Sequence, residues 1–140
     1  MISKPTSLMA QQIAQSAAAF QHQRTGHAPA AVTVVQSDGT LVITLHDALT
    51  PAEKAMAKTP KGASKVQEFH RKLFMTSASA LRDEITRITG VAVREATAEI
   101  EPKSGTVVQV FTNGTMVQVF LLAHGVPAAQ WDAQVGGEAL

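Results

Sequence analysis

Two dipeptides set most of the limits on what this chain can fold into: Asp38-Gly39 and Asn113-Gly114. Each lies between two stretches rich in β-branched apolar residues. Asp-Gly and Asn-Gly are the residue pairs most typical of two-residue type I′ hairpin turns. The sequence therefore predicts an antiparallel sheet that contains two hairpins, one in each half of the chain.

A two-residue turn also fixes which residues face each other. In the first hairpin, the expected core-facing pairs are Val34 with Ile43 and Val32 with Leu45, while the opposite, threonine-bearing face is half exposed. In the second hairpin, the same rule pairs Val108 with Val119, and Val110 with Val117. The other face of that hairpin carries Gln109, Gln118 and apolar neighbours, and we expect it to meet another element or a second subunit.

The helical pattern is longest between residues 60 and 89, where Thr59-Pro60 marks a start and Gly90 a stop. Thirty residues span roughly 45 Å, more than twice a six-residue strand of about 20 Å. Its expected buried stripe is Val66, His70, Leu73, Ser77, Leu81, Ile85 and Ile88, thickened by Phe69 and Phe74. With a further helix at residues 6–24, the predicted class is α+β in the order α-β-β-α-α-β-β-β.

A short helix is predicted to begin at Pro51, just before the long one. Thr50 suits the N-cap, Pro51 the first helical position, and Glu53 stands three residues after the cap. This is a capping box, in which Thr50 and Glu53 satisfy each other's backbone N–H groups. These residue types are explained by helix capping without any catalytic role.

Composition is that of one soluble domain. The chain has 140 residues, 45% of them hydrophobic and 16% charged, with a net charge of +1 and no cysteine. We expect one domain at residues 1–125 and a loosely held tail at residues 126–140. Apolar runs are too short for a membrane-spanning helix, and no signal peptide is recognisable, so the expected location is the cytoplasm.

The sequence contains few candidates for catalytic or metal-binding residues. The five histidines lack metal-ligand spacing, and there is no cysteine, phosphate-binding glycine loop or Gly-x-Ser-x-Gly elbow. Glu99 and Glu101 share one strand face, as acid–base catalysis would allow, but alternating charge on an exposed strand explains them equally. His70 is expected to be an interior histidine with one hydrogen bond. No catalytic residue, cofactor or metal site is predicted.

The clearest charge feature covers residues 53–72, where six basic residues face two glutamates for a local charge of +4. Such a segment suits an acidic partner, a membrane surface or nucleic acid, although a solvated helix face has the same appearance. Aromatic residues suited to base stacking are missing, so no nucleic acid is expected. The candidate partner-binding residues are Lys54, Lys58, Lys61, Lys65, Arg71 and Lys72.

At Leu49-Thr50-Pro51-Ala52-Glu53-Lys54, followed by Ala57-Lys58-Thr59 and Gly62, the chain resembles the MpsC family of small soluble proteins. The resemblance covers roughly residues 5–123 and includes Thr89-Gly90-Val91 and Ser104-Gly105-Thr106. One departure is Gly26-His27-Ala28-Pro29, where family members often have Gly-x-Gly-Pro.

The resemblance implies a link to a membrane system that generates membrane potential or takes up inorganic carbon such as bicarbonate. It implies an accessory role, in regulation or assembly, and no enzyme activity. We therefore expect a non-enzymatic protein that docks on a membrane-transport protein and is peripheral to the membrane through that partner. The predicted long helix, which outruns six-residue strands, separately favours a homodimer in which it packs against a second copy. The alternative is a sensor or enzyme that binds a small anion or metabolite in a pocket at the Thr50-Pro51 helix start.

Overall fold

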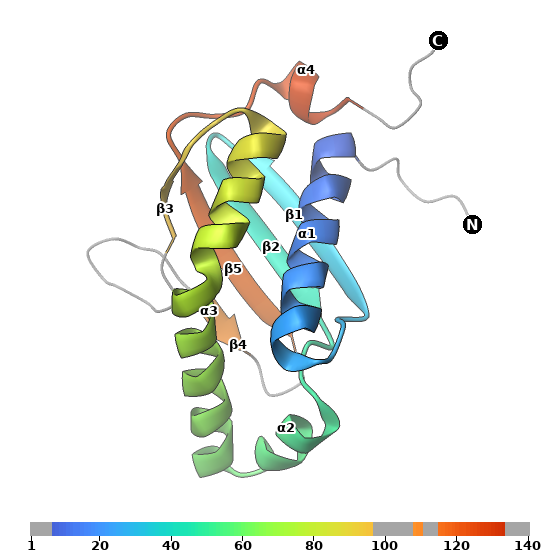
Figure 1. Ribbon diagram of the computed structural model, residues 1–140, viewed down its shortest axis with the longest axis vertical. Coiled ribbons are helices and arrows are strands. Elements are labelled where there is room, and N and C mark those ends of the chain that lie inside the picture. Colours follow the sequence, from blue (N-terminus) through green and yellow to red (C-terminus); the bar gives the residue numbers. More distant parts are fainter. Residues whose placement is uncertain (1–6, 97–107, 111–114, 134–140) are drawn as a thin grey trace.

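The computed structural model describes residues 7–96, 108–110 and 115–133. Its helices are α1 (Leu8–Thr25), α2 (Pro51–Met56), α3 (Pro60–Thr89) and α4 (Ala128–Trp131); its strands are β1 (Ala31–Ser37), β2 (Thr40–His46), β3 (Val93–Glu95), β4 (Val108–Val110) and β5 (Met116–Leu122). The α+β class and the predicted element order are confirmed, with the short α4 added at the end. Figure 1 shows α1 and α3 across one face of the sheet, and α2 and the beginning of α3 extending past it.

The sheet is antiparallel throughout, with strand order β1-β2-β5-β3, and β4 pairs with β5 as well. The first hairpin has the predicted register, with Val34 opposite Ile43 and Val32 opposite Leu45. Asp38 and Gly39 have φ angles of 51° and 83°. Both are positive, as a type I′ turn requires. The Asn113-Gly114 turn lies outside the described residues.

The register predicted for the second hairpin is wrong by one residue. Val108 pairs with Gln118 and Val110 with Met116, not with Val119 and Val117. Strand β5 is held on its other edge by β2, and its buried residues are Met116, Gln118, Phe120 and Leu122. Because a shift of one residue exchanges the two faces of a strand, Val108 and Val110 are paired with the buried Gln118 and Met116 of β5 instead of the half-buried Val119 and Val117.

The core lies between the helices and this covered face. From α3 it receives Val66, His70, Phe74, Ala78, Leu81, Ile85 and Ile88, largely the predicted stripe. Phe74 packs on Phe120 with ring centroids 5.7 Å apart. Two predictions fail here: Leu73 and Ser77 are only half buried, and Phe69 is 50% exposed. The stripe turns slightly around the helix, so that Phe74 and Ala78 take the central positions.

The opposite face of the sheet is more exposed. Along β2, Leu41, Ile43 and Leu45 are fully buried, whereas the residues between them are half buried. Val35 on β1, on the same face as the threonines, is 61% exposed.

At the end of the described chain, Trp131 is buried against the core and the Leu8 N–H donates to the Ala133 carbonyl at 2.7 Å. In the described parts of the chain, no helix is long and apolar enough to cross a membrane.

Candidate functional site at the α2–α3 corner

Helix α2, the turn after it and the beginning of α3 form a projection, residues 50–70, here termed the α2–α3 corner. Its first turn is held by the predicted capping box. The Glu53 backbone N–H donates to Thr50 Oγ1 at 3.2 Å, and the Thr50 N–H donates to Glu53 Oε1 at 2.9 Å. With Pro51 at the first helical position, the local sequence determines where α2 begins.

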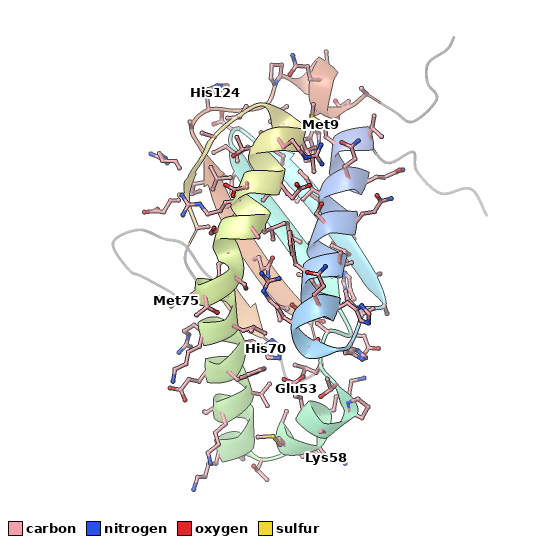
Figure 2. The ribbon with its side chains drawn as sticks, in the orientation of Figure 1. Met9, Glu53, Lys58, His70, Met75 and His124 are labelled. Carbon is pink, nitrogen blue, oxygen red and sulfur yellow. The ribbon has the colours of Figure 1, made fainter. Side chains whose placement is uncertain are left out.

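The second oxygen of the same carboxylate bonds a histidine of α3. His70 Nε2 lies 2.7 Å from Glu53 Oε2, and the two side chains are only 1% and 13% exposed. Figure 2 shows His70 pointing from α3 toward Glu53. A carboxylate only accepts hydrogen bonds, so Nε2 is the donor. The prediction of an interior His70 with one hydrogen bond is confirmed, but its partner, 17 residues away, was not foreseen.

The helices can approach this closely because α3 has a glycine in its first turn. Thr59 caps α3 by accepting from the Gly62 N–H at 3.0 Å. A Cβ atom on Gly62 would lie 1.8 Å from the Met56 carbonyl oxygen, far inside van der Waals contact. Only glycine fits at that position while the end of α2 stays where it is.

The six candidate basic residues differ in their partners and in their exposure. Lys54 forms an ion pair with Asp47, and Lys72 forms one with Glu68 at 3.7 Å. The hydrogen bond and charge of Lys54 lower the pKa of the Asp47 carboxyl below its ordinary value. Arg71 is half buried.

Lys58, Lys61 and Lys65 are exposed, and none has an acidic partner in the described residues. Lys58 stands at the tip of the corner (Figure 2), and Lys61 and Lys65 follow one helical turn apart. These three are the exposed lysines of the basic segment without an acidic partner in the described residues.

Beside them lies an open apolar pocket of about 450 Å³, termed here the corner pocket. Met56 of α2 and Val66 and Phe69 of α3 form its apolar wall, and Arg24 and Lys65 are among its charged lining residues. Met56 and Phe69 are 46% and 50% exposed, although both are large apolar side chains. The sequence predicts a pocket at the Thr50-Pro51 helix start as the alternative site, and Thr50 does line the corner pocket. The contribution of Phe69 differs from the prediction, which places that residue in the buried stripe.

Chemistry beyond binding has little support in the geometry. Over the described ranges, no three His, Asp or Glu side chains come close enough together to hold a metal ion. Glu99 and Glu101 lie outside the described residues. Glu53 and His70 are committed to each other and to the α2 cap, so the arrangement acts as a structural link between two helices.

Comparison with known proteins gives one match. No curated protein and no solved structure is significantly similar to the chain. One family model, described as "Na+-translocating membrane potential-generating system (MpsC)", matches residues 6–114, which include the whole α2–α3 corner. Since this match extends over more than half of the 140 residues, the chain belongs to the MpsC family.

Proposed function

We propose that this protein is a non-enzymatic accessory component of a Na⁺-translocating, membrane-potential-generating system, and that it docks on a membrane protein of that system through the α2–α3 corner. The family description supports the system. The observation that supports the docking site is the corner pocket, open and apolar, with unpaired lysines beside it. The alternative system for the same accessory role is one that transports inorganic carbon such as bicarbonate.

The surface has the usual composition of a binding site. Aromatic and methionine side chains are enriched at protein interfaces, a few anchor residues supply most of the binding energy, and surrounding charges steer the approach. Here Phe69 and Met56 are the apolar anchors, and Lys58, Lys61 and Lys65 attract negative charge. The partner segment should therefore be acidic and present one bulky apolar side chain to the pocket.

The charge contribution is tested by co-purification of tagged protein with solubilised membranes of its native host. Lys61→Glu/Lys65→Glu should lower the yield of the co-purifying membrane protein at least tenfold. Lys61→Glu alone should lower the yield several-fold, and Arg94→Glu is its matched control, because it makes the same charge change at an exposed site outside the corner. Equal yields from Lys61→Glu and Arg94→Glu would overturn docking through the lysines.

The apolar contribution has its own matched pair. Phe69 and Met75 are both exposed large apolar residues of α3, but only Phe69 lines the corner pocket. Phe69→Ala should weaken co-purification about tenfold, the effect of losing an interface anchor. Met75→Ala should leave it unchanged. If Met75→Ala weakened binding as much, the pocket would not be the docking site.

A small-molecule site is the second candidate. The corner pocket touches Thr50 and Glu53, and its volume is in the range of small-ligand sites. Against an anion, the Thr50 N–H is already occupied by the Glu53 carboxylate. Bicarbonate, phosphate and nucleotides can be screened by thermal shift. A rise of several degrees that Phe69→Ala abolishes would favour this candidate over docking.

We also propose a homodimer formed through the exposed face of the sheet. Val35, Val42 and Val119 form one row across β1, β2 and β5 on that face. A valine and threonine surface is self-complementary, as a twofold interface requires. Light scattering should give a mass near twice 14.8 kDa, and Val35→Glu should halve it. A mass of 14.8 kDa at every concentration would rule the dimer out.

A further inference from the structure

A second, smaller cavity lies between α1, α3 and β5, separate from the corner pocket. Its volume is about 30 Å³. Gln21 of α1, His70 of α3 and Gln118 of β5 all line it, and we call it the polar chamber. These three are 6%, 2% and 6% exposed, so a mostly apolar cavity contains three polar side chains that the fold has taken out of water.

Within the described residues, each of these side chains has a polar atom without a hydrogen-bond partner. They are Gln21 Nε2, His70 Nδ1 and Gln118 Oε1, all buried. A buried polar atom without a hydrogen bond costs about 1–3 kcal/mol of folding free energy. Such atoms are rare in folded proteins, and three that line one cavity indicate a ligand that bonds them.

The donors and acceptors specify the ligand. Gln21 Nε2 is a donor and needs an acceptor, whereas Gln118 Oε1 needs a donor. In the neutral imidazole that donates from Nε2 to Glu53, Nδ1 is an acceptor and also needs a donor. The ligand must accept one hydrogen bond and donate two.

Water meets this requirement. A metal cation cannot accept from Gln21, and the Arg24 guanidinium that also lines the chamber repels it. A halide ion cannot donate to Gln118. A buried water needs about 10–15 Å³ and typically makes about three hydrogen bonds. We infer that the polar chamber is a hydration site for up to two water molecules, one of which bridges Gln21, His70 and Gln118.

This site would extend the link to the α2–α3 corner. The bridging water holds His70 in the form that donates from Nε2, Nε2 bonds Glu53, and Glu53 caps α2. Beside the chamber, Arg24 of α1 donates to the Phe20 carbonyl of its own helix at 3.2 Å. It also donates to the Ser77 carbonyl at 3.4 Å, and this bond joins α1 to α3. The inference does not depend on the proposed docking function.

The test measures water contacts to this chain by NMR and crystallography. In the native protein, long-lived water should give cross-peaks to the Gln21 side-chain amide, and density should show a water bonded to all three atoms. Gln118→Met should keep the water on Gln21 and His70, while Gln21→Leu/Gln118→Met should expel it and lower the cross-peak at least fivefold. Gln12→Leu, on the exposed side of α1, should change nothing.

Two results would overturn the inference. One is a dry chamber in the native protein, with the two glutamine side chains bonded directly to each other or to His70. The other is a native His70 Nδ1 whose ¹⁵N shift is that of a free, unbonded ring nitrogen. Because both are measured on the native chain, they hold even if the double variant fails to fold.

Discussion

Glu53 is bonded on both carboxylate oxygens: Oε2 lies 2.7 Å from His70 Nε2, and Oε1 lies 2.9 Å from the Thr50 backbone nitrogen. One side chain thus caps α2 and fastens that helix to α3. Helix α2 has few other buried contacts, since none of its own residues is buried. Its position should therefore depend on this carboxylate more than on apolar packing.

His70→Ala should lower the free energy of unfolding by about 3 kcal/mol, because it leaves a cavity and removes the partner of a nearly buried carboxylate. Urea denaturation measures the loss. His22→Ala is the control, since His22 is exposed on α1 and its removal should cost no more than about 0.5 kcal/mol. Equal losses in the two variants would show that the Glu53–His70 contact contributes nothing.

Thr50→Ala should cost about 1 kcal/mol, the usual value for an N-cap. The loss comes from leaving the Glu53 backbone N–H without its acceptor. Thr50→Ser keeps a hydroxyl at the same position and should retain most of the stability. Thermal unfolding of the three proteins decides the matter, and a Ser variant as unstable as the Ala variant would argue against capping.

Much of this architecture is local in origin and could be predicted. The Asp38-Gly39 turn and the Thr50 capping box depend on residues within a few positions of each other, so the sequence carries their geometry directly. The second hairpin shows the limit of such reasoning. Its register depends on β2, which pairs with the far edge of β5 and is some 70 residues away in the chain.

The candidate site was only partly predictable for the same reason. Counting charges along the sequence identifies the lysines. It does not show that Lys54 pairs with Asp47, whereas Lys58, Lys61 and Lys65 have no acidic partner in the described residues. A helical period places Phe69 near the buried stripe, but this residue is in the first part of α3, which extends past the sheet, and it is 50% exposed in the wall of the corner pocket. Both facts follow from how the elements are arranged in space.

Gly62→Ala should destabilise the protein, although alanine normally favours a helix by about 1 kcal/mol over glycine. The added Cβ would meet the Met56 carbonyl, so the α2–α3 corner must open. We expect a net loss of about 1–3 kcal/mol, the usual cost of overpacking. Ser64→Ala, exposed in the same turn, should be neutral. A Gly62→Ala protein more stable than the native one would mean that the α2–α3 corner opens without a cost in free energy.

The Asp47–Lys54 pair provides a pH test. The hydrogen bond from Lys54 and then its charge lower the pKa of Asp47, with a smaller contribution from His27. Because the folded pKa is depressed, the contribution of the pair to stability is present above the ordinary aspartate pKa and is lost as pH falls through the folded value.

Lys54→Met should raise the Asp47 pKa toward its ordinary value in a ¹³C NMR titration of the carboxyl. Lys72→Met, which removes a lysine paired with Glu68 instead, should leave the Asp47 titration unchanged. If Asp47 titrated identically in all three proteins, Lys54 would be free in solution and would join the unpaired lysines of the corner.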